Sequence, residues 1–97
     1  MSISDHKRIL ICGANGLLGR SLCKNFTEHH YKLIISDINE DGLAALAEDI
    51  VSMGGAHPQI QVMDIRSELS IADGFANLHE AGLLPQGVIN ASYPRNK

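Results

Sequence analysis

The sequence predicts an α/β fold, in which a parallel β-sheet carries helices on its faces in the order βαβαβαβ. Two observations lead to this fold class. Short apolar runs with the composition of strands alternate along the chain with segments whose apolar residues recur at helical spacing. Glycine or polar residues separate the segments, and alternating elements of these lengths imply parallel strands joined by right-handed crossovers.

The first half of the chain supplies two strands and a helix. Residues 9–12 are a continuous apolar run with β-branched residues, typical of a strand buried on both faces, and the run ends at Gly13. A helix over about residues 16–30 is predicted by four apolar residues at helical spacing: Leu17, Leu18, Leu22 and Phe26. A second apolar run, residues 33–35, is followed by Ser36 and Asp37 and predicts the second strand.

The second half continues the alternation. We expect Asn39 to cap a helix that ends at Gly54. The buried side of this helix is predicted at Leu43, Leu46, Ala47, Ile50 and Val51. A third strand over residues 60–64 contains Gln61, and a polar residue inside the run indicates partial exposure at a sheet edge.

A third helix and a fourth strand complete the pattern. Ser67 is expected to cap this helix, and Gly82 is expected to end it. Its apolar positions are Ile71, Phe75, Ala76 and Leu78. Residues 88–91 then form the fourth strand, so residues 1–97 constitute one α/β unit without a linker or repeat.

Composition restricts the classes of partner. Eight Lys and Arg against eleven Asp and Glu give a net charge of −3, whereas nucleic-acid and anionic-membrane binders need a concentrated basic face. Apolar runs fall short of the ~18 residues that span a bilayer, and the first residues lack the order of a signal peptide. Because the chain has only Cys12 and Cys23, we expect a cytoplasmic protein with reduced thiols.

A glycine-rich loop, residues 13–19, joins the first strand to the first helix and is typical of a turn that binds pyrophosphate. Gly13 can form the tight turn, Gly16 can let phosphates approach backbone N–H groups, and Gly19 can let the helix pack closely on the sheet. This context predicts a Rossmann-like fold with strand order 3-2-1-4, the N-terminal portion of a doubly wound NAD(P)-binding fold. Cofactor contacts are expected from Gly13, Asn15, Gly16, Leu17, Leu18 and Gly19.

The loop has two other possible interpretations. A glycine-rich turn that merely joins strand to helix is the simpler alternative. A P-loop is set aside because Gly19 is followed by Arg20 and Ser21 rather than by Lys and then Ser or Thr.

Asp37, at the end of the second strand, predicts which dinucleotide is bound. A carboxylate there can accept hydrogen bonds from the adenosine ribose hydroxyls, and it would repel a 2′-phosphate. We therefore expect NAD to be preferred over NADP. The alternative is a solvated turn aspartate.

These features together resemble the N-terminal part of the short-chain dehydrogenase/reductase family, over nearly the whole chain from about Arg8. The resemblance rests on the glycine loop, Asp37, Asp64-Ile65 and Asn90-Ala91-Ser92. It implies an oxidoreductase that transfers hydride between a nicotinamide cofactor and an alcohol or carbonyl substrate. It also implies that Asp64 holds the adenine amino group, that Ile65 packs on the ring, and that Asn90 and Ala91 lie beside the cofactor.

Residues 89–97 are similar to family members from bacterial sugar pathways that modify flagellin or make nonulosonates, which implies a sugar-like small-molecule substrate. The sequence departs from the family at Cys12 and Ser92, where Thr and Gly are usual.

No catalytic residue is assigned. Tyr93 and Lys97 have the Tyr-x-x-x-Lys spacing of the family's catalytic pair, which requires both side chains on one face of a helix. Pro94 restrains Tyr93 away from helical conformation. Because the resemblance covers under half of a typical member, we expect the chain to be a fragment, the cofactor-binding portion of a longer enzyme. The fourth strand would then carry an unpaired edge, which predicts self-association.

No metal site is predicted either. His29 and His30 lack a cluster of Cys, Asp or Glu at ligand spacing, and imidazoles at a helix C-terminus interact favourably with its dipole. Cys12 is interpreted as a small core residue, and its separation from Cys23 is not that of a Cys-x-x-Cys pair.

Three functions remain open on this evidence. The chain is the cofactor-binding part of an oxidoreductase, a non-catalytic module that holds a dinucleotide, or the product of a degraded reading frame with no function. Turnover separates the first from the second, and cooperative melting separates the third from both.

Overall fold

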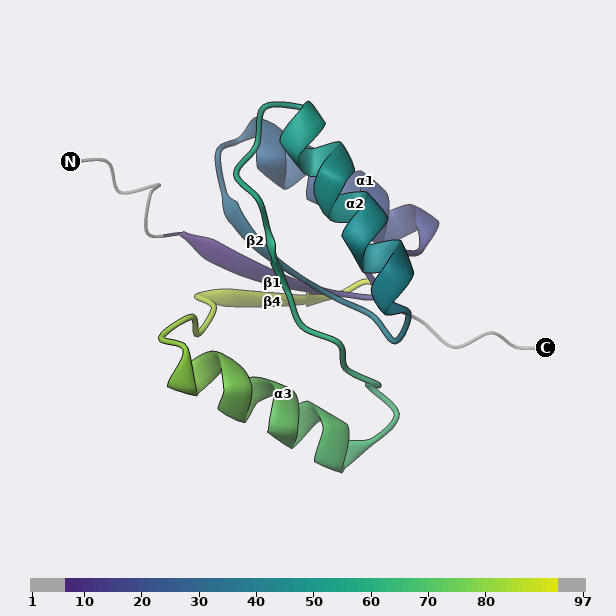
Figure 1. Cartoon of the computed structure of the whole chain (residues 1–97), viewed down its shortest axis with the longest axis vertical. Coiled ribbons are helices and arrows are strands. Elements are labelled where there is room, and N and C mark those ends of the chain that lie inside the picture. Colours follow the sequence, from purple (N-terminus) through teal and green to yellow (C-terminus); the bar gives the residue numbers. More distant parts are fainter. Residues whose placement is uncertain (1–6, 93–97) are drawn as a thin grey trace.

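The computed structural model describes residues 7–92 as three layers (Figure 1). A four-stranded parallel sheet lies between α1 and α2 on one face and α3 on the other. The elements are β1 (Arg8–Cys12), α1 (Leu17–Glu28), β2 (Lys32–Ser36), α2 (Glu40–Ser52), β3 (Gln59–Ile60), α3 (Glu68–Glu80) and β4 (Gly87–Asn90). The strand order is β3-β2-β1-β4, which confirms the predicted Rossmann-like topology.

The register brings the carboxyl ends of three strands level with one another. Cys12, the last residue of β1, pairs with Ser36 of β2 and with Asn90 of β4. The residues that follow these ends therefore lie along one edge of the sheet, here called the carboxyl edge. In open parallel sheets ligands bind at this edge, where the connections leave the strands.

Alternating side chains along the strands build a separate core on each face of the sheet. The face under α1 and α2 has the larger cluster, ten buried residues: Ile11, Ala14, Cys23, Leu33, Ile35, Leu43, Leu46, Ala47, Ile50 and Ala91. The face under α3 has five: Leu10, Cys12, Ile34, Met63 and Leu78. Burial on both sides explains why β1 and β2 are continuous apolar runs.

The predicted helix boundaries at polar and glycine residues are confirmed. The Asn39 side chain accepts a hydrogen bond from Gly42 N–H at 3.2 Å, and the Ser67 hydroxyl accepts one from Ser70 N–H at 3.2 Å. Gly54 and Gly82 follow α2 and α3 with φ of 94° and 72°, the left-handed conformation that ends a helix.

The third strand is shorter than predicted. Regular pairing covers only Gln59 and Ile60 rather than residues 60–64. Beyond it, Gln61 N–H donates to the Ile35 carbonyl at 3.0 Å and Met63 N–H to the Asp37 carbonyl at 3.1 Å. The segment therefore continues beside the chain that follows β2, although β2 itself ends at Ser36. Past that end, the Ile38 N–H donates a hydrogen bond to the Asp37 carboxylate at 2.8 Å.

The buried faces of two helices also differ from the apolar pattern. In α1 the buried residues are Gly19, Cys23 and Thr27, whereas Leu17 is 92% exposed because it starts the helix at the carboxyl edge. Val51, predicted to be buried in α2, is 45% exposed because Leu46, Ala47 and Ile50 already fill the face against the sheet. In α3, Ala76 is likewise exposed. Within residues 7–92, none of the helices combines the length and apolarity required to cross a membrane.

Candidate functional site

The glycine loop forms a tight turn directly after β1. Gly13 has a φ of 76°, and the N–H groups of Gly13 and Ala14 both donate to the Ser36 carbonyl of β2 at 2.9 and 3.0 Å. A Cβ on Gly13 would contact the backbone of Ser92, with 2.7 Å to its nitrogen. Both the backbone conformation and the space therefore require glycine at position 13.

The other two loop glycines have different surroundings. A Cβ on Gly19 would lie 2.7 Å from the Cα of Ala14, so glycine is what lets α1 rest on the turn. Gly16 is exposed, and a Cβ there would meet only the Gly13 carbonyl oxygen, at 3.5 Å. The fold therefore needs Gly13 and Gly19 but tolerates a side chain at Gly16. The exposed side of Gly16 is therefore accessible to a ligand that approaches the loop.

The first turn of α1 faces the same space. Gly16 is the N-cap residue with extended backbone (φ −76°, ψ 172°), and no described side chain caps the helix. Leu17 and Leu18 follow at 92% and 43% exposure. A helix start without a capping side chain presents backbone N–H groups and the positive end of the helix dipole, an arrangement suited to an anion.

Asp37, at the end of β2, lies against this loop. Its Oδ2 accepts a hydrogen bond from Asn15 N–H at 3.0 Å, and its Oδ1 accepts one from Ile38 N–H at 2.8 Å. Each carboxylate oxygen has two acceptor positions, so both oxygens retain capacity for hydroxyl donors. The two parts of the predicted site, loop and carboxylate, are thus joined by a direct bond.

Asn15 also ties the loop to α2 and to its own helix. Its Nδ2 donates to the Asn39 carbonyl at 3.1 Å, and its carbonyl accepts from Arg20 Nε at 3.0 Å. A Cβ on Gly42 would lie 2.7 Å from the Asn15 amide nitrogen, so glycine in α2 makes room for this side chain. These bonds hold the loop in one conformation relative to Asp37.

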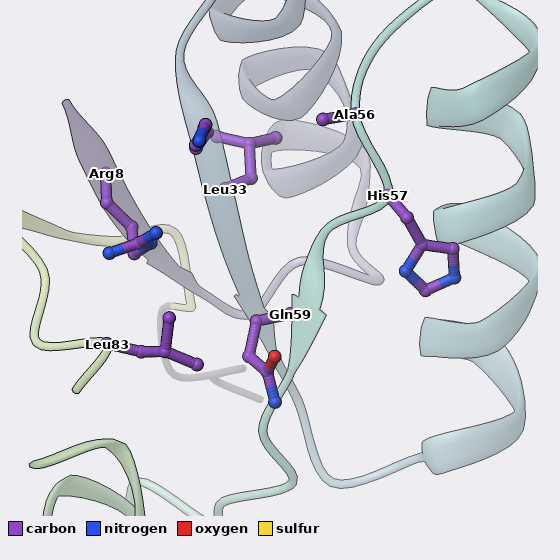
Figure 2. Close-up of a pocket in the computed structure, with 7 residues that line it drawn as sticks. Arg8, Leu33, Ala56, His57, Gln59 and Leu83 are labelled. Carbon is purple, nitrogen blue, oxygen red and sulfur yellow. The ribbon is translucent and has the colours of Figure 1, made fainter. Parts of the chain in front are cut away.

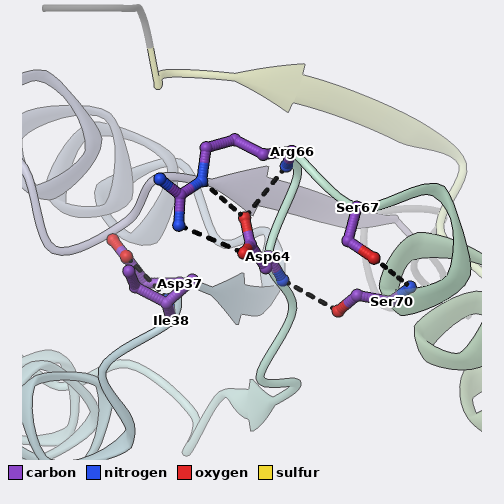
Figure 3. A network of polar contacts seen from close by, with 6 residues as sticks. All are labelled: Asp37, Ile38, Asp64, Arg66, Ser67 and Ser70. Carbon is purple, nitrogen blue, oxygen red and sulfur yellow. Dashed lines mark hydrogen bonds and ion pairs between the residues drawn. The ribbon is translucent and has the colours of Figure 1, made fainter.

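Asp64 and Ile65 follow Met63, whose N–H donates to the Asp37 carbonyl, and Figure 3 shows the polar contacts around Asp64. Arg66 forms an ion pair with Asp64, with Nε 3.0 Å from Oδ1 and Nη2 3.2 Å from Oδ2. The Arg66 backbone N–H also donates to Oδ1 at 3.0 Å. These hydrogen bonds from Arg66, its side chain first, hold the pKa of the Asp64 carboxyl below its ordinary value. The ion pair therefore favours the charged form of the Asp64 carboxylate.

The fourth strand brings the remaining predicted residues to the same edge. Asn90 ends β4 and is exposed, and its Oδ1 accepts a hydrogen bond from Ser92 N–H at 3.0 Å. Ala91 is buried under α1, and its N–H donates to the Cys12 carbonyl at 2.8 Å. Asn90 thus lies beside the start of the glycine loop. Tyr93 and Lys97 lie outside the described residues.

Two features lie apart from this site. A hollow of about 230 Å³ lies at the opposite, amino end of the sheet, lined by Arg8, Lys32, Leu33, Ala56, His57, Gln59 and Leu83 (Figure 2). The His29 ring contacts the Asn25 carbonyl of its own helix at 2.8 Å. Among the residues that the structure describes, no three His, Cys, Asp or Glu side chains are placed to hold a metal ion.

Sequence reasoning did not identify the Arg66–Asp64 pair or the hydrogen bond from Asn15 to Asp37. The Asp-x-Arg spacing in residues 64–66 was a usable signal, because a residue two positions away in a turn can fold back onto a carboxylate. The bond from Asn15 involves a backbone N–H, which any residue type supplies, so no sequence signal exists for it.

Comparisons with known proteins bear on the fold and on the family resemblance. No family model matches the chain. It is 29% identical over 93 residues to the post-translational flagellin modification protein A of Campylobacter coli, covering 96% of this chain and 36% of that protein. This match agrees with the resemblance seen in residues 89–97.

Solved structures show the fold. A variant of actinorhodin polyketide ketoreductase with NADPH superposes with a TM-score of 0.84 at 18% identity, covering 99% of this chain and 36% of that one. A short-chain dehydrogenase from Mycobacterium smegmatis superposes with a TM-score of 0.81 at 18% identity, covering 93% and 37%. The resemblance to short-chain dehydrogenases/reductases is therefore confirmed in the fold, and the chain spans about a third of the length of these relatives.

Proposed function

We propose that the chain binds NAD at the carboxyl edge and supplies the cofactor-binding part of an oxidoreductase of the short-chain dehydrogenase/reductase type. The observation that carries the proposal is the hydrogen bond between Asn15 N–H and the Asp37 carboxylate, at 3.0 Å. It holds together the turn that would bind phosphate and the carboxylate that would bind ribose.

The residues present fit a dinucleotide. The pyrophosphate would meet the backbone of Gly16 and the first turn of α1, where a Cβ on Gly16 would have only an ordinary contact, at 3.5 Å to the Gly13 carbonyl oxygen. Asp37 would accept from the ribose hydroxyls. Asp64 and Ile65 would contact the adenine, and Asn90 and Ala91 would lie beside the rest of the cofactor. When bound, the nicotinamide supplies hydride chemistry, acting on an alcohol or carbonyl substrate.

The preference for NAD over NADP follows from charge. Asp37 is an acidic group at the position where the 2′-phosphate of NADP would lie, and like charges repel. The proposed sugar-like substrate rests on the resemblance of residues 89–97 to members of bacterial sugar pathways. The two free thiols, Cys12 and Cys23, are buried and support the proposed cytoplasmic location.

Self-association through β4 is part of the proposal. This strand ends the sheet and, among the described residues, pairs with β1 on one side only. Val88, on the same face as Leu10, is 54% exposed, and Leu84 just before the strand is 49% exposed. Open backbone groups beside apolar side chains favour pairing with another strand.

Calorimetric titration of the chain with NADH and, separately, with NADPH tests the proposal. We expect saturable binding that favours NADH, and loss of that binding in Gly16→Ala, whose added methyl group occupies the phosphate approach and has only an ordinary contact with the fold, at 3.5 Å. Ser21→Ala, an exposed change on the same helix, is the control and should bind as the wild type does. A wild-type chain that melts cooperatively and binds neither dinucleotide would refute the proposal.

A further inference from the structure

We propose that Arg66 is a further cofactor-binding residue, whose guanidinium group forms a flat platform for the adenine ring. The inference rests on the proposed function, because it requires a dinucleotide at the carboxyl edge. The Asp37 carboxylate itself provides no flat surface for the base, so we place the adenine on a neighbouring segment.

The position of that segment follows from the backbone. With the pyrophosphate at the start of α1 and the ribose on Asp37, the base extends away from α1, toward the segment after β3. Met63 N–H donates to the Asp37 carbonyl at 3.1 Å, which places the start of this segment directly beside the ribose site. In the view of Figure 3 the Arg66 side chain reaches back over Asp64 toward the end of β2.

Asp64 orients the guanidinium. The two side-chain bonds, at 3.0 and 3.2 Å, join the planar group to both carboxylate oxygens, so its orientation is set by the carboxylate rather than by a flexible side chain. The two bonds hold the guanidinium edge-on to the carboxylate, which leaves the face of the guanidinium open to a stacked ring.

The exposure of Arg66 supports a role in binding rather than in folding. The side chain is 79% exposed in the ion pair, and exposed pairs contribute little to stability. An open guanidinium face is what a stacked aromatic ring requires, and arginine stacks on rings through both its charge and its planar shape. Replacing Arg66 should therefore change cofactor affinity while the chain still folds.

The test compares Arg66→Ala, Arg66→Lys and, as a control, Lys24→Ala, an exposed lysine on α1. Each variant is titrated with NADH and with NADPH by calorimetry, and its melting is recorded. We expect Arg66→Ala to weaken both dinucleotides alike, by about 3- to 30-fold, the range of a cation–π contact. Arg66→Lys keeps the charge without the planar group and should recover little of the loss. Lys24→Ala should match the wild type.

The other outcomes overturn the inference in distinguishable ways. If the wild type binds NADH and Arg66→Ala binds it equally well, the platform is wrong while the proposed function stands. A loss confined to NADPH, or full recovery in Arg66→Lys, would show that the guanidinium acts as a charge on phosphate rather than as a surface for the ring. A wild type that binds neither dinucleotide overturns the proposed function and the platform together.

Discussion

Gly19→Ala should destabilise the fold, and its magnitude can be estimated from the packing of α1. The added Cβ would lie 2.7 Å from the Ala14 Cα and 2.9 Å from the Ala14 carbonyl carbon. Carbon atoms pack at about 3.5–4.0 Å, so the helix must retreat by roughly 1 Å from backbone that cannot rotate away. The retreat also loosens Cys23 and Thr27, the other buried residues of the same face.

The net cost combines two opposing effects. Overpacking of this kind costs roughly 1–3 kcal/mol, and backbone contact favours the upper end. Alanine gains about 1 kcal/mol over glycine as a helix former, which leaves a loss of about 2 kcal/mol. For a domain of this size that loss lowers Tm by roughly 8–16 °C.

Thermal and urea unfolding, followed by far-UV circular dichroism, measures this effect. Gly16→Ala is the matched control, because its Cβ has only an ordinary contact at 3.5 Å and its backbone conformation suits alanine. The control should lose about 1 kcal/mol at most, through the weaker N-cap. A Gly19→Ala variant that melts at or above the wild-type temperature would refute the packing role of this glycine.

Three further predictions concern charge, thiols and the sheet edge. Asp37→Asn keeps an oxygen for the Asn15 N–H but removes the charge, so the ratio of NADPH to NADH affinity should rise roughly tenfold in calorimetric titrations; an unchanged ratio would contradict the ribose role. Burial raises the pKa of the Cys23 thiol from 9.0 to about 12, so above pH 9 the unfolded chain releases a proton that the folded chain retains. Stability in urea should therefore fall as the pH rises from 9 toward 12, by up to about 1.4 kcal/mol per pH unit, and Cys23→Ala should reduce this slope; a flat profile would count against the burial effect. Val88→Lys should reduce self-association in sedimentation velocity, whereas Leu69→Lys, at a residue 78% exposed on α3, should not; equal effects would exclude β4 as the contact.

The sequence predicts the topology because the strands are buried on both faces. Ile11 and Ile35 face one layer and Leu10 and Ile34 the other, so the runs had to be apolar throughout and were recognisable as such. The caps at Asn39 and Ser67 were equally visible, because few residue types accept a hydrogen bond from a helix N-terminus.

The predictions that were wrong concern side-chain burial and strand length, which depend on residues that are neighbours in space rather than in the sequence. Val51 fits the apolar spacing of α2 but lies beside a face that other residues have already filled. Leu17 and Leu18 fit the spacing of α1, yet the face that packs on the turn consists of Gly19, Cys23 and Thr27. The length of β3 depends on where β2 ends, which the residues of β3 do not encode.

The buried core is larger on the face of the sheet under α1 and α2 than on the face under α3, so the two layers should differ in how readily they unfold locally. α3 buries only Gly74 and Leu78, over the smaller cluster, whereas α2 alone buries Leu43, Leu46, Ala47 and Ile50. Amide hydrogens of α3 should therefore exchange with solvent through partial unfolding, before those of α2 do. Asp64 is attached to this weaker layer, because its N–H donates to the Ser70 hydroxyl of α3 at 2.9 Å. A ligand held by both Asp37 and Asp64 would join the two layers, and slower exchange in α3 would report its binding even where no catalysis can be measured.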